Sequence, residues 1–158
     1  MKIGRYRKDD GRSATGIVVE IDGASKVLDL DAACEAFDPG GGPPRSLPDL
    51  IAGGRRFLPD IAAVADKARA EGEAGWFTAV DALSWQTPSD PVLCLCAGRN
   101  FVKHLQEAKE LWAARSGASD QRSFPTGFIK LSANLVPHDS VVSRPIDVGT
   151  LDYEVEVA

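Results

Sequence analysis

Residues 15–31, TGIVVEIDGASKVLDLD, contain two apolar runs separated by the pair Asp22-Gly23. A two-residue turn between antiparallel strands needs positive backbone φ angles, which glycine adopts at little cost and aspartate tolerates. The stretch therefore predicts a β-hairpin with strands over 15–21 and 25–31. Residues 2–7, KIGRYR, predict a further strand before it.

Helical patterns follow the hairpin. Residues 32–37 predict a short helix that ends before the Gly- and Pro-rich segment 38–44, which lacks the features of a phosphate-binding loop. Ser46 is suited to cap the next helix at its N-terminus. In residues 58–72 the apolar side chains that recur at helical spacing before Gly72 are Ile61, Val64, Ala65 and Ala68. These patterns predict a small α+β domain over residues 1–85.

A polar segment with two prolines, QTPSDP at 86–91, indicates a domain boundary, and we expect a second unit over residues 86–158. In this unit 92–98 is an apolar run of strand length. Residues 100–115 have a helical pattern, with Asn100 at the capping position and an apolar stripe of Phe101, Leu105, Ala108 and Trp112. Two further strands are predicted around the turn 137–140, at 127–136 and 140–146.

The composition is that of a soluble globular protein. The chain has 158 residues, of which 44% are hydrophobic, and a formal net charge of −5. No apolar run approaches the length of about eighteen residues that spans a bilayer, and the first residues lack the apolar stretch of a signal peptide. Lys and Arg are scattered among acids, whereas nucleic-acid-binding proteins carry basic patches. We therefore expect a cytoplasmic protein with neither a membrane nor a nucleic acid as partner.

The three cysteines, Cys34, Cys94 and Cys96, match neither a disulfide framework nor a zinc site. Their number is odd, no C-x-x-C pair is present, and no histidine stands at zinc-site spacing. Cys94 and Cys96 share one face of the predicted strand 92–98. We interpret them as small buried thiols in a core strand.

Two histidines are candidates for proton transfer. His104 and Glu107 are three residues apart and therefore lie on one face of the predicted helix. A carboxylate that orients an imidazole is what a general base requires, although a solvated surface pair has the same spacing. His138 lies in the predicted turn 137–140 and is interpreted as a loop residue.

The C-terminal residues 151–158, LDYEVEVA, alternate apolar and acidic side chains. On a strand, Asp152, Glu154 and Glu156 would project to one side, where their mutual repulsion requires either water or a cation. One interpretation is an edge strand with a wet acidic face. The other is a site for Mg²⁺ or Mn²⁺, which prefer carboxylate oxygens, with a further ligand supplied from elsewhere.

The order and spacing of four motifs resemble the fumarylacetoacetate hydrolase family over residues 91–158. The motifs are GRNF at 98–101, H-x-x-E at 104–107, FIK at 128–130 and DYEVE at 152–156. Each motif is unspecific by itself, but together they are specific. Residues 1–85 are similar, more loosely, to the small domain that precedes the catalytic domain in bacterial members.

The resemblance implies roles for particular residues. His104 and Glu107 would be the dyad that activates water, and Glu154 and Glu156 would be two ligands of Mg²⁺, or of Mn²⁺ or Ca²⁺ in its place. Lys130 would lie near the substrate. The residues that would border the pocket are Arg99 and Asn100.

The resemblance also implies the fold and the activity. We expect an α+β protein in which the N-terminal domain precedes the beginning of a mixed β-sandwich roll, with a third metal ligand, an Asp, beyond residue 158 and a homodimer at full length. The implied reaction is metal-dependent hydrolysis of a C–C bond in a small 1,3-dicarbonyl or 2-oxo acid. Two alternatives stay open: an isomerase, decarboxylase, dehydratase or lyase acting on a 2-oxo acid through an enolate, and a non-catalytic truncated homologue.

Overall fold

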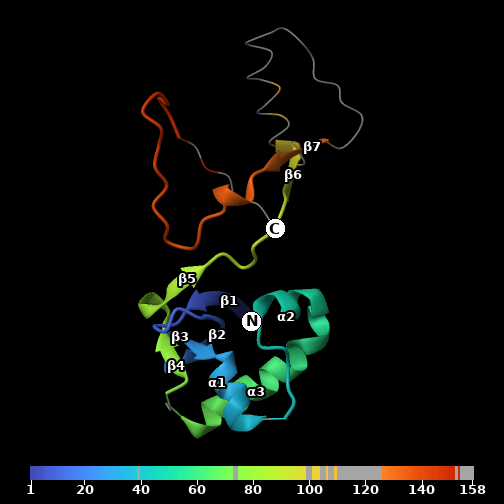
Figure 1. The fold of residues 1–158 in the computed structure, drawn as a ribbon, viewed down its shortest axis with the longest axis vertical. Helices are drawn as coiled ribbons and strands as arrows, with labels where there is room; N and C mark the ends of the chain where they lie inside the picture. Colours follow the sequence, from blue (N-terminus) through green and yellow to red (C-terminus); the bar gives the residue numbers. More distant parts are fainter. Residues whose placement is uncertain are drawn as a thin grey trace.

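The computed structural model of the chain is shown in Figure 1; it describes residues 1–38, 40–72, 75–98, 101–103, 106, 109, 126–151 and 153. A five-stranded sheet with helices is followed along the chain by a two-stranded sheet. The predicted α+β class is confirmed. Every helix within the described ranges is too short or too polar to cross a bilayer.

The larger sheet is antiparallel and curls into a half-barrel with the strand order β4-β3-β2-β1-β5. The predicted hairpin is confirmed: β2 pairs with β3 around Asp22 and Gly23, which have φ angles of 51° and 79°. The strands are β1 (Lys2–Arg7), β2 (Ser13–Ile21), β3 (Ala24–Asp29), β4 (Phe77–Ala79) and β5 (Ser84–Gln86).

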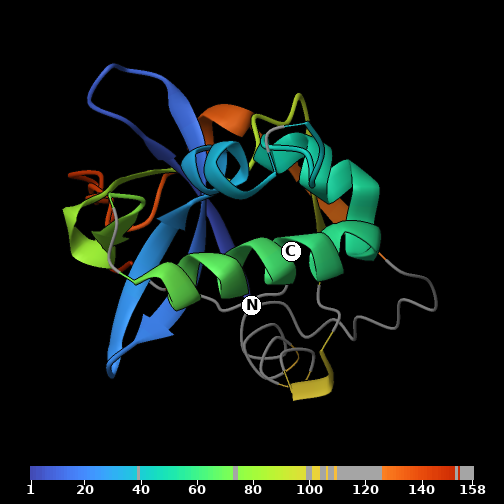
Figure 2. The ribbon, with the colours of Figure 1, turned by 90° about the horizontal axis from the view of Figure 1, so that it is seen from below.

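Helices cover one face of this sheet, as Figures 1 and 2 show from two directions. The Ser46 cap is confirmed, since its side chain accepts a hydrogen bond from the Asp49 N–H. All four residues of the predicted stripe, Ile61 to Ala68, are buried against β2 and β3. The helices are α1 (Leu30–Phe37), α2 (Leu47–Gly53), the 3₁₀ turn η1 (Gly54–Phe57) and α3 (Leu58–Glu71).

The opposite face of the sheet holds a second small core. Tyr6, Ala14 and Val27 are buried there beneath Trp85 and the 3₁₀ turn η2 (Val80–Ala82). Glycine makes this packing possible, because a Cβ atom on Gly16 would lie 2.4 Å from Val27 Cγ1. The β2 strand therefore needs glycine at position 16 for steric reasons.

Replacing Gly16 by alanine is expected to lower the free energy of unfolding by about 1–3 kcal/mol, the usual cost of overpacking a core. Urea unfolding measures this value. Gly40→Ala is the matched control, because a Cβ atom at position 40 would meet nothing within 4 Å. Equal stability of the two variants would contradict the packing described here.

Asp29 ends β3 and caps α1. Its Oδ1 accepts a hydrogen bond from the Ala32 N–H at 3.1 Å, while its Oδ2 accepts one from the Tyr6 hydroxyl at 2.8 Å and lies 2.5 Å from Lys8 Nζ. Burial acts to raise the pKa of Asp29, but Lys8, the Ala32 N–H and Tyr6 together outweigh it and lower the pKa. Burial and the hydrogen bond with Asp29 raise the pKa of Tyr6 far above its usual range.

Asp29→Ala is expected to lower the free energy of unfolding by about 2 kcal/mol at pH 7, from the lost cap and the lost Tyr6 hydrogen bond. Because the folded-state pKa is lowered, the contribution of the carboxylate is present above the unfolded pKa near about 4 and is lost as the pH falls through the folded value. Urea unfolding at pH 7 and pH 3 checks this expectation. Asp29→Asn, which keeps a capping oxygen, should lose less, and an equal loss for Asp29→Ala at both pH values would refute the assignment.

The smaller sheet consists of β6 (Cys94–Gly98) and β7 (Thr126–Lys130), followed by the 3₁₀ turn η3 (Ser132–Asn134). The predicted strand 92–98 is thus confirmed in most of its length, and the strand predicted at 127–136 stops at Lys130. The helix predicted at 100–115 and the terminal alternation lie mostly outside the described residues.

Several expectations are corrected by the structure. The strand predicted at 140–146 is wrong: this segment is irregular, and Val141 and Ile146 are 91% and 94% exposed. A strand requires a ladder partner, and no described strand pairs with these residues. Cys94 and Cys96 are half-buried instead of buried, because β7 is the one described strand that pairs with β6. The three-residue strands β4 and β5 were not predicted.

Candidate functional site

The β6–β7 pair carries the described part of the predicted site. Cys94 faces Lys130 at one end of the register, and Gly98 faces Thr126 at the other. Gly127 permits the close approach of the strands, because a Cβ atom there would lie 2.9 Å from the carbonyl oxygen of Cys96. The apolar run of β6 therefore finds its partner in the strand that ends with Lys130.

Lys130 is the predicted site residue that the structure describes. It is the last residue of β7, its side chain is exposed, and its Nζ lies 5.5 Å from the centroid of the Phe128 ring. Residues two apart on a strand share a face, and an aromatic ring attracts an ammonium group placed over it. The charge of Lys130 is thus presented on one face of the pair, where an anionic group could approach it.

The register also separates Lys130 from the residues that follow β6. Lys130 lies opposite Cys94, and Arg99 follows Gly98 directly in the sequence. Cys94 and Gly98 are four residues apart, which corresponds to about 13 Å along a strand. The ladder by itself therefore does not bring Lys130 to the end at which the chain continues into the GRNF motif.

The other six predicted site residues lie outside the described residues: Arg99, Asn100, His104, Glu107, Glu154 and Glu156. Their roles stay predictions. Within the described ranges, no three His, Cys, Asp or Glu side chains converge in a way that could hold a metal ion. The donor chemistry of the predicted ligands does fit Mg²⁺, since both are carboxylates.

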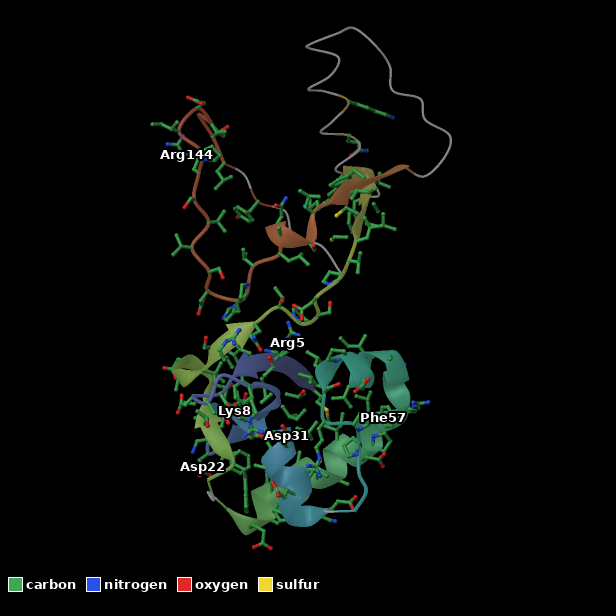
Figure 3. All side chains as sticks on the ribbon, in the orientation of Figure 1. Arg5, Lys8, Asp22, Asp31, Phe57 and Arg144 are labelled. Carbon is green, nitrogen blue, oxygen red and sulfur yellow. The ribbon has the colours of Figure 1, made fainter. Side chains whose placement is uncertain are left out.

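An ion pair connects the segment before β6 to Arg5 of the larger sheet, which is labelled in Figure 3. The two Nη atoms of Arg5, on β1, donate to the two carboxylate oxygens of Asp90, each at 2.7 Å, and Nη2 also donates to Thr87 Oγ1 at 3.3 Å. The hydrogen bonds with Asp90 raise the pKa of Arg5, and those with Arg5 lower the pKa of Asp90. This contact, made through both carboxylate oxygens of Asp90, joins the chain to β1 four residues before β6 begins.

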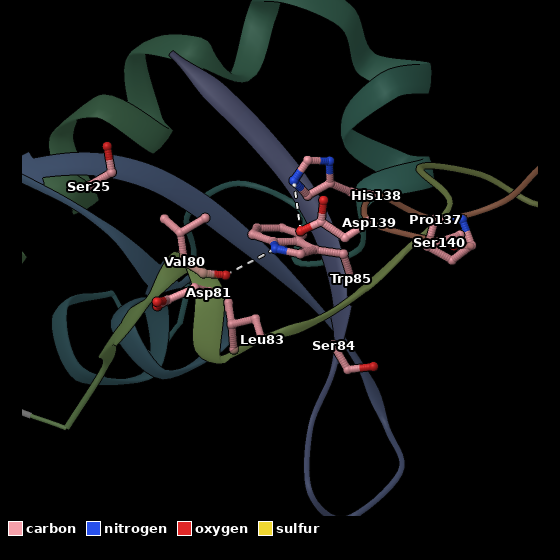
Figure 4. A pocket seen from close by; sticks show the side chains of 10 residues that line it. All are labelled: Ser25, Val80, Asp81, Leu83, Ser84, Trp85, Pro137, His138, Asp139 and Ser140. Carbon is pink, nitrogen blue, oxygen red and sulfur yellow. Dashed lines mark hydrogen bonds and ion pairs between the residues drawn. The ribbon is translucent and has the colours of Figure 1, made fainter. Parts of the chain in front are cut away.

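His138 lines a cleft between the turn 137–140 and the edge of the larger sheet, with a volume of about 670 Å³ (Figure 4). Its Nε2 lies 3.5 Å from Asp139 Oδ2, and both side chains are exposed. The indole Nε1 of Trp85 donates a hydrogen bond to the Val80 carbonyl, so this N–H is already engaged within the protein. The interpretation of His138 as a loop residue agrees with this exposed turn position. The cleft was not foreseen, because it joins segments that are far apart in the sequence.

Comparison with known protein families finds a match in the second part of the chain. Residues 93–158, the last 66 of the 158 residues, match the family model described as fumarylacetoacetate (FAA) hydrolase C-terminal. No curated protein matches the chain. The matched segment begins one residue before β6 and contains all four motifs. The resemblance of residues 93–158 to the fumarylacetoacetate hydrolase family is thereby confirmed.

Proposed function

We propose that this protein is a metal-dependent hydrolase that cleaves a C–C bond in a small 1,3-dicarbonyl or 2-oxo acid of the fumarylacetoacetate or acylpyruvate type. Proteins of the family are typically enzymes and commonly depend on a metal. The observation that carries the proposal is the family match over residues 93–158, because this segment contains the predicted dyad and both predicted metal ligands.

In the proposed reaction, His104 takes a proton from water while Glu107 orients its imidazole and stabilises the imidazolium that forms. The water oxygen bonds to the acyl carbonyl carbon, and the bond from that carbon to the adjacent CH₂ breaks. The bonding electron pair stays with the CH₂ fragment, which takes up a proton. One molecule of water and one of acylpyruvate thus give one carboxylic acid and one pyruvate.

Lys130 supports the choice of an anionic substrate. Its ammonium is exposed on the face of β7 that also presents Phe128. We propose that it holds the carboxylate of the 2-oxo acid, with Arg99 and Asn100 bordering the same pocket.

Glu154 and Glu156 would hold the Mg²⁺. The ion, when bound, would supply positive charge where negative charge develops on the oxo-acid oxygens. Two protein carboxylates leave coordination positions for water and substrate, as Mg²⁺ usually requires.

A substrate panel tests the proposal. The protein is incubated with an acylpyruvate, with oxaloacetate and with an unsaturated 2-hydroxy acid, each with and without Mg²⁺. We expect consumption of the acylpyruvate with release of a carboxylic acid. Release of CO₂ from oxaloacetate alone, or isomerisation without cleavage, would assign one of the other family activities. No turnover of any member would overturn the proposal.

A further inference from the structure

The first domain concentrates its exposed apolar side chains at one place. Among the described residues of 1–91, the large hydrophobic side chains that are exposed are Met1, Ile51 and Leu58, at 64%, 57% and 38%. All three line the same groove. Singly scattered apolar side chains on a surface need no explanation, but an apolar cluster marks a binding surface.

The groove lies between the start of β1 and α2, which are neighbours in Figure 1. Its floor includes Leu47 and Leu50, which are each only 5% exposed, and its volume is about 410 Å³. Pro88, from the segment before β6, forms part of its wall. Small-molecule sites are lined mainly by apolar side chains, as this groove is, and their volumes of about 300–1,000 Å³ include the volume found here.

Charge identifies the polar end of the occupant. Arg55, in the 3₁₀ turn η1, has the charged side chain among the described residues that line the groove, and it is exposed. An arginine at the edge of an apolar groove is suited to a carboxylate, which it can bind through two parallel hydrogen bonds. We propose that the groove binds a medium-chain alkyl carboxylate, with the alkyl chain along Leu47 and Leu50 and the carboxylate at Arg55.

The size of the groove disfavours a second copy of the chain as its occupant. Nine of the described residues line it, whereas a stable protein–protein interface takes about 20–30 residues from each side. An alkyl chain requires only the apolar strip. The proposed site shares no residue with those assigned to hydrolysis. Binding of an alkyl carboxylate and hydrolysis of a dicarbonyl acid can therefore be tested independently.

Calorimetric titration of the full chain with decanoate, octanoate and decanol tests the proposal. Each buried methylene contributes about 0.8 kcal/mol, so decanoate should bind about tenfold more tightly than octanoate. Arg55→Gln should weaken decanoate binding about two- to fivefold, the range expected for an exposed ion pair, and should leave decanol unchanged. Ile51→Ser should weaken both ligands.

Arg56→Gln is the matched control, because it removes the same charge from the neighbouring residue. Arg56 does not line the groove, and its guanidinium lies 4.5 Å from the centroid of the Phe57 ring. Ile51, Arg55 and Arg56 are exposed, and circular dichroism establishes that each variant is folded. The proposal would be overturned if the wild-type chain did not bind decanoate, or if Ile51→Ser bound decanoate as tightly as the wild type. It would also be overturned if Arg55→Gln and Arg56→Gln changed decanoate binding equally. So would self-association of the wild-type chain that Ile51→Ser abolishes, since a second copy would then be the occupant.

Discussion

Replacing His104 by alanine is expected to lower the turnover of an acylpyruvate by about 10²-fold or more, the usual effect of removing a positioned general base. The reason is that no other group would be placed to take the proton from the attacking water. The loss should appear mainly in kcat, because the imidazole would act on the water and not on the bound 2-oxo acid. Steady-state kinetics with the full-length gene product measures both constants.

Gln106→Ala is the matched control for this variant. Gln106 lies two residues from His104 in the sequence, and its side chain is exposed. It should retain the wild-type rate. A His104→Ala enzyme that hydrolyses the acylpyruvate at the wild-type rate would remove the general-base role and favour an isomerase or decarboxylase.

Replacing both Glu154 and Glu156 by glutamine is expected to abolish the metal-dependent part of turnover, a loss of about 10³-fold or more. Charge stabilisation by a metal is worth several kcal/mol, and each 1.36 kcal/mol is a factor of ten in rate. Removing both carboxylates leaves too few protein oxygens to hold Mg²⁺ against water. The rate is measured after chelation and again after titration with Mg²⁺.

Asp147→Asn provides the control for the loss of negative charge, because Asp147 is exposed and lies outside the DYEVE motif. It should show the wild-type dependence on Mg²⁺. Full activity of the double glutamine variant in excess chelator would contradict the assignment of both glutamates as metal ligands.

Local signals predicted most elements of the larger sheet and its helices. The Asp22-Gly23 pair predicted the turn because a tight hairpin turn requires positive φ angles, which these two residues tolerate. Ser46 caps α2 through a hydrogen bond with a residue three positions away in the sequence. The apolar residues from Ile61 to Ala68 lie on one face of α3, and that face is buried. In each case the residues that carry the signal also make the interaction.

Elements that depend on distant partners were not predictable in this way. The strand β5 has three residues and exists because β1 offers an edge, with Trp85 opposite Tyr6 in the register. Residues 140–146 have the composition of a strand but pair with no described strand. The half-buried positions of Cys94 and Cys96 likewise depend on how many strands lie beside β6.

For the candidate site, the residues were predicted from the sequence motifs, and the structure adds the position of one of them, Lys130. The motif FIK predicted Lys130, but its register opposite Cys94, away from Gly98, follows only from the pairing of β6 with β7. The family match covers residues 93–158, and the roles of the individual residues in this segment stay predictions.

The most direct test of the hydrolase proposal is the stoichiometry of products from an acylpyruvate, followed by NMR with the full-length gene product. With Mg²⁺ present, the carboxylic acid and pyruvate should appear together in a 1:1 ratio as the substrate disappears, and chelation should stop both. Formation of both products at an unchanged rate in excess chelator, or loss of the acylpyruvate without an equivalent of pyruvate, would contradict metal-dependent cleavage of the C–C bond.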